Sequence, residues 1–330
     1  MIKVKNNIGI PKYRQIINAI EESIRSGDLK KGDQIDSINK IRNYNNLSRD
    51  TVLTAFNELK SRGIIRSIVG KGYYVNSEDI NVHEKIFLLF DELNSFKEDL
   101  YYAFLDNLGP NIQVDIYFHH FNLSIFKRLI SDHIDDYNYY VIMPANFTNT
   151  SSIIQQLPDD KVYILDQLHD DLHQYPAVYQ NFEKAIYEHL TQVLERISKY
   201  KKLILSFSED KQPVAMKNGF VSFCEHQNIP FEIVENLKDR VLEKGELYIT
   251  PEDKGLLRIL KKMKNQDFEL AEDVGVISYN DTLLKELVEG GITTISTDFE
   301  MMGKYLAQMI KGQDQQKIEN PNQLIIRNSL

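Results

Sequence analysis

Residues 48–75 restrict the possible folds of this chain more than any other stretch. Ser48 can cap a helix that ends at Gly63, and an apolar run at 64–68 follows at once. A Gly-Lys-Gly turn at 70–72 then leads into a second short apolar run. A helix, a strand, a tight basic turn and a second strand, in this order, are typical of a winged helix. We therefore predict a DNA-binding domain at this end of the chain.

The residues before this stretch complete the pattern. Apolar residues recur at helical spacing between Pro11 and Gly27, which predicts a first helix. Ser37 can cap a short second helix. Three helices followed by a strand hairpin predict a winged helix-turn-helix domain over residues 1–76.

The start of the third helix is the predicted base-reading end, because N-terminal residues of a recognition helix reach base edges. Arg49 lies there, and a guanidinium can donate two hydrogen bonds to guanine. Lys71 lies at the wing tip, where it can reach a minor groove or the backbone. Taken singly, Arg49 or Lys71 could be an ordinary solvated cation. The order of the helix, strand, turn and strand around them favours a role in DNA binding. The predicted DNA contacts are Ser37, Asn39, Ser48, Arg49, Asp50, Thr51, Thr54, Arg66, Gly70, Lys71 and Gly72.

Residues 11–75 resemble the GntR family of bacterial regulators throughout. Two departures are visible: Ile35-Asp36-Ser37 replaces the usual Leu-Pro-Ser, and Asn39 stands where the family carries a DNA-contacting arginine. The motifs that carry the resemblance are Ile24-x-x-Gly27-x-Leu29, Ser48-Arg49-x-Thr51-Val52, Gly63-Ile64-Ile65 and Gly70-x-Gly72.

Charge divides the chain in the same place. Residues 1–76 hold 14 Lys and Arg against 7 Asp and Glu, whereas residues 77–330 hold 25 against 41. A basic region beside an acidic one indicates that only the first docks on phosphate. We place a short polar linker at 77–83 and a further domain at 84–330.

Composition excludes several classes of protein. With 330 residues the chain can form two or three domains. Its single cysteine, Cys224, rules out an internal disulfide and a cysteine-based zinc site, and is expected to be buried. We expect no metal and no cofactor. No secretory signal and no apolar stretch near the roughly 18 residues of a membrane span is present, so a cytoplasmic location is expected.

Residues 84–330 alternate apolar runs with amphipathic stretches, which predicts βαβ units and mostly parallel sheets. Polar side chains follow several of the predicted strands, where ligands of open α/β sheets bind. Such ends are also polar simply because they enter loops. Carboxylates and amides there suit the hydroxyls of a sugar. The predicted effector contacts are Asp91, Asn94, Phe96, Asn146, Asp166, Lys217, Asp253, Asn280 and Asp281.

This second region resembles the periplasmic-binding-protein-like sensor domain of LacI/GalR regulators. The resemblance implies two lobes around a ligand, and a GntR head joined to such a sensor is the layout of arabinose-type sugar regulators. Asn280 stands where many members have a sugar-binding Asp, and Met216 where an Arg often grips hydroxyls. The segments that carry the resemblance are Leu88–Asp91, Asn218-Gly219-Phe220, Glu272–Thr282 and Leu324–Ser329.

The fold expected is therefore multidomain, α+β and α/β: a winged helix-turn-helix followed by a two-lobed α/β sensor. The function expected is a dimeric transcription regulator, a repressor, which binds a pseudo-palindromic double-stranded operator and responds to a monosaccharide. A neutral sugar is favoured over a phosphosugar, and Lys217 is the cation that could reverse this. The alternative is a DNA-binding head fused to an enzyme domain acting on a sugar or amino acid. The region is short for a pyridoxal-phosphate fold and has none of the hydrolase or nucleotide-binding motifs sought.

Overall fold

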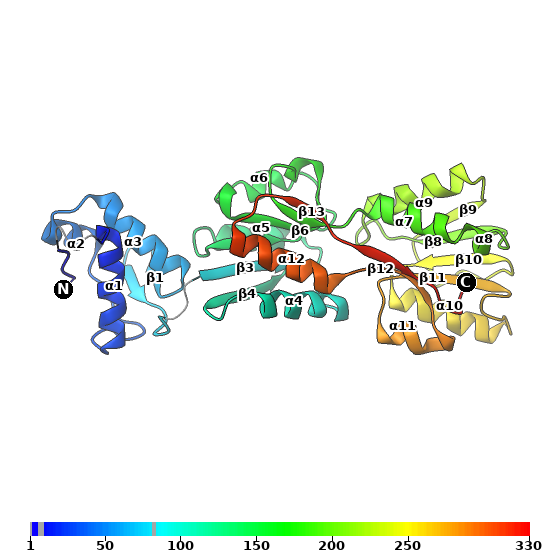
Figure 1. Ribbon diagram of the computed structural model, residues 1–330, viewed down its shortest axis with the longest axis horizontal. Helices are drawn as coiled ribbons and strands as arrows, with labels where there is room; N and C mark the ends of the chain where they lie inside the picture. Colours follow the sequence, from blue (N-terminus) through cyan, green and yellow to red (C-terminus); the bar gives the residue numbers. More distant parts are fainter. Residues whose placement is uncertain (1, 6–9, 81–83) are drawn as a thin grey trace.

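The computed structural model describes residues 2–5, 10–80 and 84–330 of the chain. Residues 81–83 of the predicted linker and residues 1 and 6–9 of the predicted first domain lie outside the described residues. The described residues form three bodies in a row (Figure 1). We call them the head domain (the described residues up to 80), the N-lobe and the C-lobe.

The head domain is the predicted winged helix-turn-helix. Its hydrophobic core joins the apolar stripe of the first helix to the buried face of the third, including Ile16, Ile20, Phe56 and Leu59. The wing turn needs glycine because φ is +73° at Gly70 and +107° at Gly72. The elements are α1 (Lys12–Arg25), α2 (Ile38–Asn45), α3 (Arg49–Ser61) and the antiparallel pair β1 (Ile65–Ile68) and β2 (Gly72–Val75).

The N-lobe is built on a six-stranded sheet in the order β13-β7-β6-β5-β3-β4, in which neighbouring strands are parallel. Helices cover both faces, so the central strands are buried on both sides. The strands are β3 (Glu84–Phe90), β4 (Ile112–Phe118), β5 (Tyr139–Ile142), β6 (Val162–Asp166), β7 (Ala177–Tyr179) and β13 (Lys317–Glu319). The helices are α4 (Ser95–Asn107), α5 (Leu123–Asp132), α6 (Ser151–Ile154), η1 (Asp159–Lys161), η2 (Asp170–Leu172) and α12 (Phe299–Gly312).

The C-lobe has the same plan, with strand order β14-β12-β11-β10-β8-β9 and only β14 antiparallel to its neighbour. Its strands are β8 (Lys202–Ser206), β9 (Phe231–Val234), β10 (Glu246–Thr250), β11 (Val274–Tyr279), β12 (Thr293–Thr297) and β14 (Asn322–Ile325). Its helices are α7 (Phe182–Gln192), α8 (Leu194–Ile197), α9 (Val214–His226), α10 (Asp253–Asn265), α11 (Leu283–Leu287) and η3 (Val288–Gly290).

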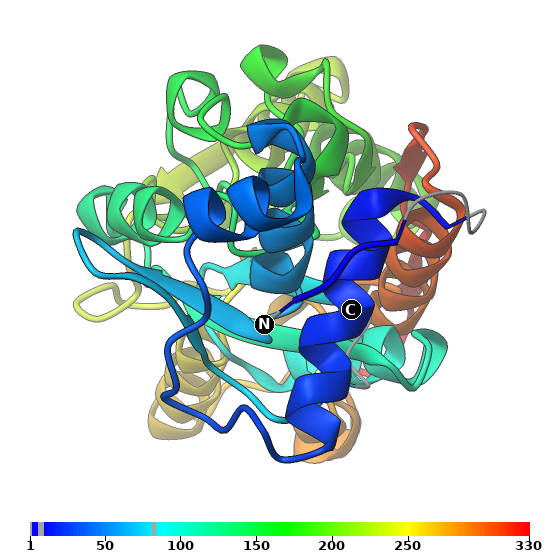
Figure 2. The same cartoon turned by 90° about the vertical axis from the view of Figure 1, so that its left-hand side faces the viewer.

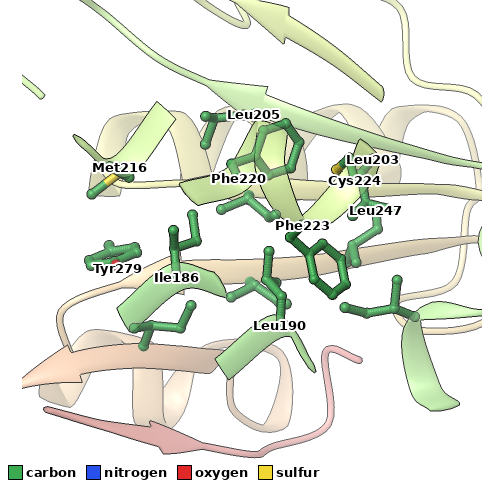
Figure 3. Packing of buried hydrophobic residues seen from close by; sticks show 14 of the residues in the cluster. Ile186, Leu190, Leu203, Leu205, Met216, Phe220, Phe223, Cys224, Leu247 and Tyr279 are labelled. Atoms are coloured by element: carbon green, nitrogen blue, oxygen red, sulfur yellow. The ribbon is translucent and has the colours of Figure 1, made fainter. Parts of the chain in front are cut away.

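One core of the C-lobe lies between its sheet and the helices α7 and α9, and it contains Cys224, buried as expected (Figure 3). Met216 and Tyr279 lie at the same end of this core. That end faces the N-lobe, because both residues line a pocket shared with N-lobe side chains.

The chain passes between the lobes three times, from β7 to α7, from β12 to α12 and from β13 to β14 (Figure 1). The two-lobed architecture and the mainly parallel sheets confirm the prediction. The strands β7, β12 and β13 were not predicted, since two are three residues long and β12 is rich in threonine. Val193 separates the helices α7 and α8. Among the described residues, no helix is long and apolar enough to cross a membrane.

Candidate DNA interface and effector cleft

The predicted base-reading end of α3 is exposed. Ser48 caps the helix by accepting a hydrogen bond from the Thr51 backbone N–H at 3.1 Å, and the two hydroxyl groups lie 2.8 Å apart. The Arg49 side chain is exposed and makes no hydrogen bond or ion pair with any other described residue. Asp50 and Thr54 are exposed on the next turn. The guanidinium is therefore free to donate to a base edge.

The wing and the start of α2 are exposed as well. The Lys71 carbonyl accepts a hydrogen bond from Gln34 Nε2 at 2.7 Å, which fixes the backbone of the turn while the side chain points into solvent. Val69 beside it is fully exposed. Ser37 and Asn39 are exposed at the start of α2. These positions remain predicted DNA contacts.

Arg66 lies elsewhere. It lines a cavity of about 420 Å³ between the head domain and the N-lobe, together with Lys60 and Asp136. The predicted role of Arg66 in DNA binding stays a prediction, but its position is at the junction of two domains.

Two polar contacts join the head domain to the N-lobe at this junction. Lys60 Nζ lies 2.9 Å from Asp136 Oδ1, and Asn138 Nδ2 donates to Ser61 Oγ at 3.1 Å. The Asn138 side chain also accepts a hydrogen bond from the Lys85 backbone N–H at 2.8 Å, near the start of β3. The head domain therefore contacts the amino ends of the N-lobe strands (Figures 1 and 2).

The opposite, carboxyl ends of the strands face the other lobe and form a cleft. A cavity of about 140 Å³, the inner pocket, lies between the lobes. Five of the nine predicted effector residues line it: Asp91, Asn94, Phe96, Asp166 and Asn280.

The N-lobe wall of the inner pocket carries buried charge. Lys97 Nζ forms an ion pair with Asp91 Oδ1, and both side chains are buried. Burial raises the pKa of Asp166 to about 6; the nearby Asp91 adds to this, while Lys97 and a hydrogen bond from Gln180 oppose it. Asp91 is thus paired with a buried lysine, while Asp166 accepts a hydrogen bond from a neutral amide.

The C-lobe wall combines the exposed charges of Lys211 and Glu252 with buried, uncharged polar atoms. Tyr279 Oη and Asn280 Oδ1 are buried and have no hydrogen-bond partner among the described residues. A buried polar atom without a partner costs free energy that a bound donor or acceptor would recover.

Phe96 and Phe299 stack with ring centroids 4.8 Å apart and add a flat apolar surface to the pocket.

A larger cavity of about 400 Å³, the outer chamber, opens beside the inner pocket. The two cavities adjoin, because both are lined by Gln167, Gln180, Phe182 and Pro213. Asn146, a predicted effector residue, lines the outer chamber and bridges the lobes by donating to the Gln212 carbonyl at 2.5 Å.

Three predicted effector residues do not line either cavity. The Asp281 carboxylate accepts hydrogen bonds from Nη1 and Nη2 of Arg327 at 2.6 and 2.7 Å. Asp253 pairs with the buried Lys285 at 3.0 Å, and Lys217 pairs with Glu209 at 2.8 Å. Each of these charges already has a partner within the C-lobe.

Sequence reasoning missed Lys97, Gln180 and Phe299. Lys97 could have been found, because Asn94 caps α4 and places its first turn beside Asp91. Gln180 and Phe299 belong to segments that cross between the lobes, and no local pattern identifies such crossings.

Comparison with protein families matches both parts of the chain. Residues 12–75 match the model of bacterial regulatory proteins of the gntR family. Residues 198–330 match a periplasmic binding protein-like domain. The second match covers the C-lobe from β8 onward and the closing segments; the helices α7 and α8 and the N-lobe strands before them lie outside it.

Curated relatives share the head domain. The HTH-type transcriptional repressor YtrA of Bacillus subtilis is 30% identical over 105 residues, which cover 31% of this chain and 81% of YtrA. The mannosyl-D-glycerate transport/metabolism system repressor MngR of Escherichia coli is 38% identical over 82 residues, 25% of this chain and 34% of MngR.

Solved structures share the fold of the two lobes. A LacI family transcriptional regulator from Silicibacter pomeroyi superposes with a TM-score of 0.64 at 16% identity, over 74% of this chain and 98% of that one. A LacI family regulator, CCPA, from Weissella paramesenteroides with bound sucrose gives 0.57 at 14% identity, over 74% and 98%. These relatives and neighbours are transcription regulators, not enzymes.

Proposed function

The chain belongs to the gntR family of bacterial regulatory proteins, and from that premise we propose that it is a sugar-responsive repressor. Its head domain binds an operator, and a sugar bound between the lobes changes the affinity for that operator. The observation that carries the proposal is the pair of unpartnered buried atoms, Tyr279 Oη and Asn280 Oδ1, facing a carboxylate-bearing wall in the inner pocket.

The chemistry of the inner pocket supports a sugar. Carboxylates accept hydrogen bonds from hydroxyl groups, and a tyrosine hydroxyl and an asparagine amide can donate or accept. The stacked pair Phe96 and Phe299 offers a flat apolar face to a ring. The structural neighbour CCPA was solved with sucrose, and another LacI-type neighbour, from Alkaliphilus metalliredigens, with D-xylulofuranose.

The two lobes supply the two states that regulation requires. A ligand that contacts both walls stabilises the closed arrangement and shifts the population toward it. The head domain contacts the N-lobe through Lys60 and Ser61, so the head domain follows that lobe when it rotates. We expect a coupling of about 1–3 kcal/mol between the sugar and the operator.

We further propose that the protein acts as a homodimer in the cytoplasm, where operator DNA is found. A single head domain is small, and two-fold pairing of half-sites supplies the remaining specificity. Helix α11 supports a second copy as its partner: Leu283 and Leu287 are each 77% exposed and lie four residues apart on one face. Sedimentation of the wild type and of Leu283→Asp/Leu287→Asp tests this; a wild-type monomer that stays monomeric on DNA contradicts it.

The direct test of the regulator uses the full chain. An operator is selected from a random duplex pool, and its affinity is measured by fluorescence anisotropy with and without each member of a sugar panel. A sugar that lowers operator affinity at least about fivefold, the small end of typical coupling, supports the proposal. If the chain selects an operator and no sugar changes its affinity, the sensor half of the proposal fails.

A further inference from the structure

The two adjoining cavities in the cleft differ in size and chemistry. The inner pocket holds the carboxylates and the unpartnered polar atoms but measures only about 140 Å³. The outer chamber measures about 400 Å³. Sites for small ligands usually have volumes of about 300–1,000 Å³, so the inner pocket alone lies below that range.

The outer chamber has apolar walls. Phe147 and Leu168 line it from the N-lobe, Phe182 lies at the crossing, and Val214 and Ala215 begin α9 on the C-lobe side. The polar residues of the chamber include Thr148, Asn149 and Asp170, whose side chains are exposed, and Asp171, which accepts a hydrogen bond from the Ser151 backbone N–H. Such a surface takes a group with a broad apolar face and few hydrogen-bonding requirements.

The boundary between the cavities is fixed by hydrogen bonds. Gln180 lines both, donates to the Asp166 carboxylate, and accepts from the Thr297 hydroxyl on another crossing segment. This amide therefore cannot turn toward a ligand without losing both contacts. A ligand that spans both cavities must lie beside this amide.

We propose that the effector is a glycoside of two units, larger than a monosaccharide. One sugar ring lies in the inner pocket against Asp91, Asp166 and Asn280. The second unit, another sugar or an apolar aglycone, lies in the outer chamber between Val214 and Thr148. This inference rests on the proposed function and names the ligand class of the same cleft.

The test measures binding to the full-length protein by calorimetry. The probes are glucose, galactose, mannose and xylose, then maltose, cellobiose, lactose and trehalose, then 4-nitrophenyl glycosides of the same sugars. We expect a two-unit probe to bind at least about tenfold more tightly than its parent monosaccharide, which is the discrimination an apolar pocket provides. Disaccharides and nitrophenyl glycosides distinguish a sugar from an apolar second unit.

Two variants place the second unit. Val214→Glu puts a charge on the C-lobe wall of the outer chamber, where Val214 is 48% exposed, and Thr148→Trp fills the chamber from the N-lobe side. Each is expected to weaken the two-unit probe at least about tenfold and to leave monosaccharide binding unchanged. Val241→Glu is the matched control, because Val241 is exposed in the C-lobe and lines neither cavity.

Two results overturn the inference and leave the proposed function standing. One is a monosaccharide that binds as tightly as its glycosides; the other is two-unit binding that survives both Val214→Glu and Thr148→Trp. If no probe of either size binds, the proposed sugar response itself fails. A two-unit probe that binds wild type and Val241→Glu alike, but neither chamber variant, supports the inference.

Discussion

Both lobes of the sensor carry a six-stranded, mainly parallel sheet, yet the strand ends that face the cleft differ in chemistry. The N-lobe offers carboxylates that already have partners: Asp91 is ion-paired with Lys97, and Asp166 accepts a hydrogen bond from Gln180. The C-lobe offers Tyr279 and Asn280, whose buried polar atoms have no partner among the described residues. A shared fold therefore does not imply a shared role in binding.

The difference has a physical consequence. Paired buried charges are costly to disturb, so the N-lobe wall is fixed before a ligand arrives. Unpartnered polar atoms gain hydrogen bonds only when a ligand is present, so the C-lobe wall gives the ligand its preference for the closed arrangement. Substitutions in the N-lobe wall should affect stability, and substitutions in the C-lobe wall should affect binding alone.

The largest effect is expected for Asp91→Ala. Removing this carboxylate leaves Lys97 buried without its partner, which costs about 3–5 kcal/mol of folding free energy. Chemical denaturation measures the loss. Asp106→Ala, an exposed position on the same helix as Lys97, is the control and should leave the midpoint unchanged. An Asp91→Ala protein as stable as the control would contradict the paired-wall description.

Arg49→Ala should change DNA binding without affecting the stability or the ligand binding of either lobe. Loss of a bidentate contact to guanine lowers operator affinity by about 1–3 kcal/mol, while sugar affinity stays the same. Lys71→Ala should weaken binding evenly across sequences and reduce its salt dependence. Anisotropy at several salt concentrations separates the two effects. Wild-type operator affinity in Arg49→Ala would show that α3 docks differently.

Tyr279→Phe tests the C-lobe wall. Removal of a buried hydroxyl that has no partner should not reduce stability, but it should weaken sugar binding by about 1–3 kcal/mol. Calorimetry and thermal denaturation of the same preparation give both values. The comparison between the lobes fails if this variant loses stability and keeps its ligand affinity.

Asp166 predicts a pH dependence. Burial raises its pKa from 3.8 to about 6, so the native state holds a proton that the unfolded state releases between these values. Its stabilising contribution is present below pH 3.8 and is lost as pH rises through 6. Hydroxyl groups donate to the ionised carboxylate, so sugar affinity should rise with pH up to about 6 and level off above it. Asp166→Asn should flatten the profile; a wild-type affinity that falls over this range contradicts the assignment.

The smallest effect is expected at the junction. The pair Lys60–Asp136 is partly exposed, so Lys60→Met should change stability by only about 0–1 kcal/mol. It should nevertheless reduce the ratio of operator affinities measured without and with sugar, because the head domain then follows the N-lobe less closely. Lys244→Met, which breaks an exposed pair with Asp273 inside the C-lobe, should leave that ratio unchanged.

Local patterns predicted the head domain well, because its helix caps and wing turn depend on residues close in sequence. Ser48 caps α3 and Gly70 takes a positive φ, as their types suggest. Alternating runs likewise predicted the parallel sheets. The short strands β7 and β13 were not predicted, because they form by pairing with distant segments and not through local β-propensity.

The site was harder to predict than the fold. Asp91, Asp166 and Asn280 follow strands and do line the inner pocket, as the rule on carboxyl ends indicated. Asp281 follows a strand too, but its carboxylate is bound by Arg327. No sequence pattern predicts a partner 46 residues away. Gln180 and Phe299 reach the pocket only because the chain crosses between lobes there.

The strand β3 connects both ends of the N-lobe. Lys85, beside the head domain, and Asp91, in the cleft, are separated by six residues of extended chain, about 20 Å. A buried strand that is paired on both sides does not stretch, so the distance between the cleft and the head domain stays fixed when the lobe rotates. For engineering, this means that a foreign DNA-binding domain grafted before residue 84 must also carry equivalents of Lys60 and Ser61. A graft without them would bind its operator and still not report the sugar.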